Sequence, residues 1–243
     1  MRPLRWLPRL VAAAGLALVV GVAGLPPSTA AAPSVPVSDE AVVRGDPARP
    51  WVALVFNVGA GYEPAVGMLD TLAEKQYQPT FFVMGWWAER QPDVLARIAE
   101  GGHEIASHGH RIFDLTEASD AAVRDDLETA DAVIAGVTGR STRPLWSPSA
   151  GYHNLRVRRI AADLGYRPIL WTIDSGDWTT DATAEGVYTK VMSRVDNGAI
   201  VVMHFDSPTT VRTTAQVLPR LIDDLRAAGF RLVNVTDLVT GGD

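Results

Sequence analysis

Apolar and amphipathic segments alternate along the chain from Trp51 onward. Seven short runs are mostly apolar along their length and rich in β-branched and aromatic residues, as strands are. These runs cover residues 51–57, 79–84, 103–107, 145–147, 168–173, 199–204 and 231–235. Because most of them lack a regular alternation of polar and apolar residues, we predict strands buried on both faces, as in a parallel sheet.

Amphipathic segments of helical length separate these runs. They cover residues 63–75, 92–100, 119–136, 154–164, 184–195 and 211–228. In the third segment, Val123, Leu127 and Ile134 share one face of a helix and acidic residues lie opposite. Regular alternation of strand and helix favours a barrel or a doubly wound sheet. Gly59 and Gly61 follow the first strand without the G-x-G-x-x-G spacing, so the pattern does not favour dinucleotide binding.

The N-terminus has the pattern of a secretory signal peptide. Arg2, Arg5 and Arg9 precede an apolar run over residues 10–25, and small residues follow it. The run is shorter than the roughly 20 residues that span a membrane, so cleavage is favoured over the alternative of a membrane anchor. We expect no stable membrane insertion after cleavage.

These features predict three parts of the chain. Residues 1–31 form the signal peptide, and residues 32–50, rich in Pro, Val and Asp, form a flexible lead-in. Residues 51–243 form one domain. We expect the protein to be secreted or associated with the cell envelope.

Composition and charge narrow the possible partners. The chain carries 22 Lys and Arg against 28 Asp and Glu, a net charge of −6. This sign argues against a nucleic-acid partner and against an anionic membrane surface. The chain has no cysteine, which excludes disulfides and zinc–thiolate sites.

Residues that could carry chemistry gather at the predicted strand ends, where parallel α/β folds place functional groups. They are Asn57, Val58, Met84, Ser107, His108, Ser147, Asp174, Asp177 and His204. A histidine beside a carboxylate can act as a general acid or base, because the carboxylate fixes the imidazole tautomer. From spacing alone, His108 and His204 could each pair with Asp174 or Asp177. A purely structural role for both histidines is equally open.

Three histidines lie close together in the sequence: His103, His108 and His110. His108 and His110 would share one face of a strand. A metal site needs further ligands, for which Asp114 and Glu104 are nearest. Taken alone, the pattern favours histidines that brace a loop over a metal site.

Three longer stretches carry a family resemblance: PTFFVMGWWAERQPDVLARIAEGGHEIASH, LWTIDSGDW and NGAIVVMHFDSPTTVRTTAQVLPRLIDDLRAAGFRLVNVTDL. With them, the region 51–239 resembles the polysaccharide deacetylase (NodB-homology) domain of the carbohydrate esterases. The resemblance implies an α/β fold, a distorted (β/α) barrel of about seven parallel strands. It also implies removal of acetyl groups from chitin, peptidoglycan or xylan with one divalent metal ion.

The first two family motifs are altered at the residues that carry chemistry. In place of T-F-D-D-G the chain has V-F-N-V-G, so Asn57 stands where the resemblance implies the catalytic base and Val58 where it implies a metal-binding Asp. In place of H-[ST]-x-x-H the chain has H-G-H-R-I. His108 keeps the first metal position, and Ile112 replaces the second histidine.

The third motif is altered too, since F-R-P-P-Y reads W-S-P-S-A here, and only the fourth and fifth are kept. Ser147 replaces the Arg that the resemblance assigns to positioning the base. Asp174, Asp177 and Trp178 keep the fourth motif, and His204 keeps the fifth, where the family has its general acid.

These losses predict an impaired or absent metal-dependent activity. One remaining metal histidine cannot hold a divalent ion against water, and asparagine cannot take a proton from water. We therefore expect no cofactor, and a protein that acts on or binds N-acetylated cell-wall or chitin-type glycan. Trp178, Trp146 and Tyr152 are candidates for contact with sugar, although core packing is equally open for the two tryptophans.

Two alternatives remain open. One is an active de-N-acetylase with a rearranged zinc site built from His108, His110 and Asp114. The other is a non-catalytic scaffold that binds a protein partner.

Overall fold

The computed structural model describes residues 34–242, so the predicted signal peptide lies outside the described residues. The strands are β1 (Trp51–Val58), β2 (Thr80–Val83), β3 (Glu104–Ser107), β4 (Leu145–Trp146), β5 (Arg167–Pro168), β6 (Ile173–Asp174), β7 (Ile200–His204) and β8 (Arg231–Leu232). The α-helices are α1 (Gly67–Glu74), α2 (Gly85–Arg90), α3 (Pro92–Glu100), α4 (Asp120–Thr138), α5 (Leu155–Asp163), α6 (Ala184–Met192), α7 (Thr214–Ala227) and α8 (Val235–Thr240). Two 3-10 turns are η1 (Ser149–Gly151) and η2 (Thr210–Arg212).

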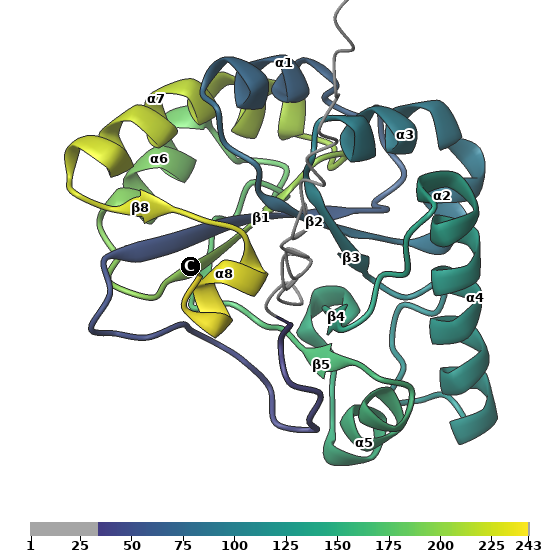
Figure 1. Ribbon diagram of the computed structural model, residues 1–243. Coiled ribbons are helices and arrows are strands. Elements are labelled where there is room, and N and C mark those ends of the chain that lie inside the picture. The colour runs from purple at the N-terminus through teal and green to yellow at the C-terminus, as the bar shows by residue number, and fades with distance from the viewer. Residues whose placement is uncertain (1–33, 243) are drawn as a thin grey trace, which may run out of the picture. The chain divides into compact units, whose positions relative to one another are not determined.

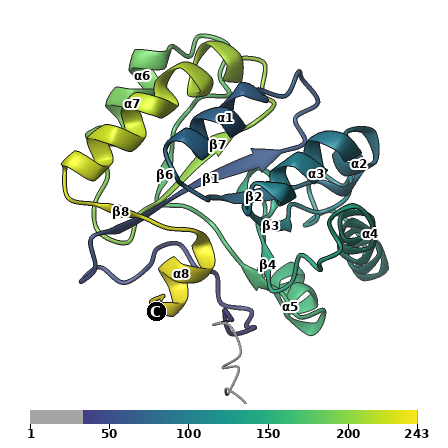
Figure 2. The same ribbon diagram turned by 45° about the horizontal axis from the view of Figure 1, so that its top comes forward.

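The strands form one parallel sheet in the order β5-β4-β3-β2-β1-β7-β6, with β8 paired to the start of β1. Helices α6, α7, α1, α3, α2 and α4 follow one another around the outside of this curved sheet (Figures 1 and 2). The predicted α/β fold, a distorted (β/α) barrel of about seven parallel strands, is confirmed. Within the described residues no helix has the length and apolarity needed to cross a membrane.

Local sequence explains several helix boundaries. Ser119, Asn154 and Thr183 each accept a hydrogen bond from a backbone N–H in the first turn of α4, α5 and α6, which satisfies a donor that the helix itself leaves free. Pro92 occupies the first turn of α3, where its missing N–H costs nothing. Gly139 ends α4 in the left-handed conformation.

The strand predicted at 168–173 is two strands instead. Its first residue belongs to β5 and its last to β6, at the two opposite ends of the sheet order. The intervening residues cross between the two sheet edges, and Ile169 stays fully buried there. The run is therefore mostly apolar although its strand pairing is interrupted.

Two helices differ from the predicted pattern. The sequence 85–90 was expected to connect elements but forms α2, and the end of the predicted strand 231–235 begins α8. Asn234 caps α8 through a hydrogen bond from Asp237 N. Asn234 follows only a short apolar run, so it does not stand out in the sequence as the start of a helix.

The described part of the predicted lead-in is packed against the domain. Val42 is buried and forms a parallel bridge with Ile169, and its N–H and C=O bond to Pro168 and Leu170. Gly45 N donates to Gly198 O over 2.8 Å. The segment 34–50 therefore covers the sheet and is not a free linker.

The pleat of the strands divides the core between two faces. On β1, Leu54 and Phe56 point to the outer cluster beneath the helices, and Ala53 and Val55 point to the inner cluster. The same period of two assigns Val202 on β7 to the inner face. Polar residues that continue the inner stripes therefore emerge together at the carboxyl ends of the strands.

Candidate functional site

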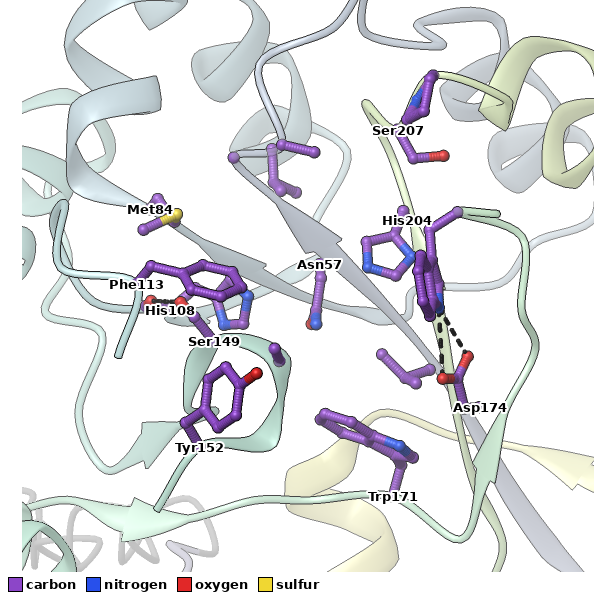
Figure 3. A pocket seen from close by; sticks show the side chains of 17 residues that line it. Asn57, Met84, His108, Phe113, Ser149, Tyr152, Trp171, Asp174, His204 and Ser207 are labelled. Carbon is purple, nitrogen blue, oxygen red and sulfur yellow. Dashed lines mark hydrogen bonds between the residues drawn. The ribbon is translucent and has the colours of Figure 1, made fainter. Parts of the chain in front are cut away.

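A cavity of about 460 Å³ opens at the carboxyl ends of the strands. Figure 3 shows the side chains that line it, with Asn57 between His108 and His204. The lining residues are Asn57, Val58, Gly59, Ala60, Met84, His108, Phe113, Ser149, Ala150, Tyr152, Trp171, Asp174, Trp178, Val202, His204, Ser207 and Pro208.

Strand register brings two of the predicted site residues side by side. Asn57 of β1 and His204 of β7 are register partners, and each continues the inner stripe of its strand. Asp174 of β6 also lines the cavity. The predicted convergence of the ends of the strands at 51–57, 168–173 and 199–204 on one cleft is therefore what the structure has.

His204 is held by a buried carboxylate. Its Nδ1 lies 2.8 Å from Oδ1 of Asp177, and its backbone N–H donates to Oδ2 of the same side chain over 2.8 Å. Thr214 Oγ1 also donates to Asp177 Oδ2. Because a carboxylate accepts only, Nδ1 carries the proton and Nε2 is directed to the cavity.

The pKa of His204 is raised above its ordinary value. Burial lowers this pKa, but the hydrogen bond to Asp177 and the charges of Asp177, Asp174 and Asp206 outweigh burial. The arrangement favours the imidazolium, which can donate a proton or a hydrogen bond to a molecule in the cavity.

His108 has the opposite character. Its Nδ1 lies 2.7 Å from the backbone carbonyl of Ser147, which fixes the proton on Nδ1 and leaves a lone pair on Nε2. Burial lowers the pKa of His108 to about 4, although the bond to Ser147 acts against this change. His108 is therefore a neutral acceptor at neutral pH.

Asn57 brings an unsatisfied amide to the cavity. The side chain is only 4% exposed, and its Oδ1 has no hydrogen-bond partner among the described residues. A buried polar atom without a partner costs stability. Such a group at the wall of a cavity is therefore available to a bound molecule.

The residues at the family's metal positions do not fit a metal ion. Val58 is buried in the outer apolar cluster, and Ile112 packs against a different cluster that contains Leu115 and Trp146. His108 alone offers a ligand atom at these positions. No group of three His, Cys, Asp or Glu side chains within residues 34–242 could hold a metal ion.

The rearranged zinc site is not formed either. His110 does not line the cavity, and its Nδ1 lies next to the start of α2, where it would be 2.4 Å from a Cβ added at Gly85. Asp114 Oδ1 accepts bonds from the N–H and hydroxyl of Thr116. The loop places the His110 ring against α2 and outside the cavity that His108 lines, so this geometry gives no support to the prediction of His110 as a possible ligand.

Two of the predicted aromatic residues line the cavity and one does not. Trp178 and Tyr152 are 50% and 46% exposed at its margin. Trp146 is fully buried among the apolar side chains between α4 and α5, so the expectation that it contacts sugar is wrong. Although β4 is only two residues long, the side chain of its last residue, Trp146, points toward the helices.

The sequence pattern missed several residues of the site, among them two aromatic residues and two aspartates. Trp171 and Phe113 line the cavity, but Trp171 lies inside an apolar run and Phe113 in a loop without a motif. The other two are buried aspartates, Asp126 and Asp206, which organise the loops around the cavity. Asp126 was assigned to the polar face of its helix.

The two aspartates play the same part for two different loops. Asp206 accepts the backbone N–H groups of Gly59, Ala60 and Gly61 over 3.0, 3.1 and 2.9 Å. Asp126 likewise accepts three consecutive N–H groups, from residues 110–112. Burial raises the pKa of Asp206 although the three amides and His204 lower it. Each carboxylate fixes a loop that follows a strand.

Comparisons with known proteins agree with this fold. The chain is 31% identical over 201 residues to YlxY, an uncharacterized protein of Bacillus subtilis, covering 82% of this chain and 60% of that protein. It is 27% identical over 204 residues to the peptidoglycan-N-acetylmuramic acid deacetylase PdaA of Bacillus subtilis, covering 82% of this chain and 75% of that protein. It thus spans less than two thirds of YlxY.

A solved structure of a pseudoenzyme also matches. BA3943 of Bacillus anthracis, a CE4-family pseudoenzyme, superposes with a TM-score of 0.76 at 27% identity, covering 83% of this chain and 69% of that chain. A mutant of BA3943 with restored enzymatic activity matches with the same TM-score. The polysaccharide deacetylase family model matches residues 44–169, just over half of the chain. With its curved parallel sheet and its cavity at the strand ends, the chain belongs to the polysaccharide deacetylase family.

Proposed function

We propose that this protein binds N-acetylated cell-wall or chitin-type glycan in its cavity and lacks the metal-dependent deacetylation of its family. The observation that carries the proposal is which side chains occupy the family's three metal-ligand positions. His108 faces the cavity with a free lone pair, but Val58 and Ile112 contribute no ligand atom and pack in separate apolar clusters.

The remaining lining favours a neutral sugar. Aromatic side chains supply apolar contact area, and a few polar groups can bond hydroxyl or amide groups, as in many small-molecule sites. The lining residues include no Lys or Arg, and the charge of the His204 imidazolium is balanced by Asp177, so no unpaired cation of the lining favours an anionic group. BA3943 is a pseudoenzyme of similar fold, which supports the proposal that this chain keeps the fold of the family without its activity. The peptidoglycan substrate of PdaA supports the proposed class of glycan.

Export belongs to the same proposal. Peptidoglycan and chitin lie outside the cytoplasmic membrane, and the predicted signal peptide at residues 1–31 would bring the domain there. The acidic net charge suits a neutral glycan better than a polyanion.

Binding to glycan tests the proposal. The protein is incubated with insoluble peptidoglycan and with chitin, sedimented and quantified, and soluble N-acetylglucosamine oligomers are titrated by calorimetry. Trp178→Ala should weaken binding, because it removes an exposed ring from the cavity margin. Tyr62→Ala is the matched control: Tyr62 is an exposed aromatic residue at 55% that does not line the cavity. Absence of binding to every glycan would refute the proposal and favour the partner-binding scaffold.

One observation favours a second candidate, an active deacetylase. The His204–Asp177 pair is intact and oriented toward the cavity. Elemental analysis of protein purified without chelator separates the two candidates. One equivalent of metal that is lost in His108→Ala would establish the active enzyme, and the proposed binding protein should contain none.

A further inference from the structure

The loop between β3 and α4 is fixed to its neighbours at both ends. Near its start, Asp126 of α4 accepts the N–H groups of His110, Arg111 and Ile112 over 2.8, 2.8 and 2.9 Å. Asp126 is only 4% exposed, so these bonds are shielded from water. A buried carboxylate with three donors holds its loop firmly.

The far part of the loop is held by an arginine. Arg156 of α5 donates from Nη2 to the backbone carbonyls of Leu115, Thr116 and Ala118 over 3.3, 2.9 and 2.9 Å. Its Nη1 bonds Asp120 Oδ1 over 2.6 Å. The planar guanidinium therefore clamps the loop in one geometry.

Between these two anchors lies Phe113, which is 60% exposed and lines the cavity. Its ring packs against Tyr152 with a centroid separation of 5.6 Å and an interplanar angle of 75°. An exposed aromatic pair on a fixed backbone leaves ring surface in water at the mouth of a cavity. Rigid aromatic anchors of this kind are typical of binding sites.

A second aromatic surface faces the same cavity from the other side. Trp178 lies beside Asp174, and its Nε1 is 3.3 Å from both carboxylate oxygens. Figure 3 shows Phe113 and Tyr152 on one side, and Asp174 on the other, with Asn57 and His204 between them. The polar groups of the cavity thus lie between two aromatic margins.

We infer that the Phe113–Tyr152 pair is a second sugar-stacking subsite, so that the cleft holds a glycan segment of at least two sugar units. One unit lies against Trp178 and the next against Phe113 and Tyr152. Pyranose rings suit this arrangement because they carry an apolar C–H face and hydroxyl groups at their edge. The inference rests on the proposed glycan binding and adds the subsite that makes binding depend on chain length.

The position of Phe113 depends on Asp126, which does not touch the cavity. Asparagine at 126 offers one acceptor oxygen in place of two and turns an amide N–H toward backbone donors. The loop then loses part of its anchor while Phe113 keeps its ring. Asp126 is therefore a positioning residue for the subsite.

The test compares two ligand lengths. Affinity for an N-acetylglucosamine pentamer is measured by calorimetry and affinity for the monosaccharide by NMR titration, with melting temperatures recorded for each variant. Phe113→Ala should weaken pentamer binding about tenfold and change monosaccharide binding less than twofold. Asp126→Asn should weaken pentamer binding in the same direction, and Phe113→Tyr, which keeps an aromatic ring, should retain it. Tyr62→Ala is the control for loss of an exposed aromatic residue.

Each outcome decides between the subsite and its alternatives. If Phe113→Ala leaves pentamer binding unchanged while Trp178→Ala weakens it, the second subsite does not exist although the protein binds glycan. If Phe113→Ala strengthens binding, the pair obstructs the cavity and the inference is wrong. If the wild-type protein binds neither ligand, the proposed function itself fails.

Discussion

Asn57 and His204 are register partners on adjacent strands, and both face the cavity. His204 retains a buried carboxylate partner in Asp177, whereas Asn57 has an amide oxygen without any partner among the described residues. His204, at the position of the general acid, thus keeps the carboxylate that orients it. Position 57, where the family has its base, holds an amide that cannot act as one. This asymmetry leads to several measurable consequences.

The pKa of His204 and the pKa values of His108 and His103 should be shifted in opposite directions. His204 should have a pKa above 6.5, because Asp177 and the neighbouring carboxylates outweigh its burial. His108 and His103 should titrate near pH 4, because burial disfavours their charged forms. Long-range ¹H–¹⁵N NMR spectra recorded from pH 3 to 9 measure all three values. At pH 6 the spectrum should show His204 as imidazolium and His108 as the neutral Nδ1–H tautomer.

Asp177→Asn should lower the pKa of His204 and change the pH dependence of stability. A raised folded pKa means that His204 contributes stability that is fully present below about pH 6.5 and is lost as pH rises through the folded value. Urea denaturation of wild type and His204→Gln at pH 5.5 and pH 9 tests this sign. The destabilisation caused by the substitution should be larger at pH 5.5, and an equal or reversed difference would contradict it.

Replacing the apolar residues at the metal positions should create metal dependence at a cost in stability. Val58→Asp with Ile112→His replaces two packed side chains by polar groups, each costing about 1–3 kcal/mol if unpaired. Zinc binding with His108 should recover part of this loss by linkage. Melting temperatures with zinc and with chelator measure the effect. The wild-type protein should show no zinc-dependent change, and a change as large as that of the variant would refute the account.

The cavity should prefer acetylated over de-N-acetylated sugar. An acetamido methyl group suits the apolar surface formed by Val58 and Met84. An ammonium group would lose hydration against these two side chains, and Asp174, the carboxylate that lines the cavity, is already bonded by Nε1 of Trp178. Calorimetry with matched N-acetylglucosamine and glucosamine oligomers at pH 6 should show at least about tenfold tighter binding of the acetylated form. Val58→Asp should narrow the ratio and Val58→Leu should keep it, whereas tighter wild-type binding of the glucosamine oligomer would contradict the role of Val58.

Sequence patterns predicted the sheet well because its strands are mostly apolar along their length. Burial on both faces makes β1 and β7 visible as continuous runs, and capping residues such as Ser119 mark the helices. The break between β5 and β6 was hidden because Ile169 remains buried where the pairing stops. Apolarity reports burial and not hydrogen bonding.

The candidate site was only partly predictable for a similar reason. Residues at strand ends, such as Asn57 and His204, follow from topology. Phe113 and Trp171 come to the cavity through loop geometry, and Asp126 is buried because it bonds three backbone amides. Such contacts join residues far apart in sequence and leave no local pattern. His110 was grouped with His108 because strand periodicity was extended into a loop that turns.

Release of acetate tests the central claim most directly. The wild-type protein is incubated with N-acetylglucosamine pentamer at saturating zinc or cobalt, and free acetate is quantified beside the His204→Ala variant. The account predicts binding of the pentamer and no acetate release above that of His204→Ala. It also predicts release from the quadruple variant Asn57→Asp, Val58→Asp, Ile112→His, Ser147→Arg, which regains the base, two metal ligands and the positioning Arg. Metal-dependent release by the wild-type protein, abolished by chelator and not exceeded by the quadruple variant, would contradict the account.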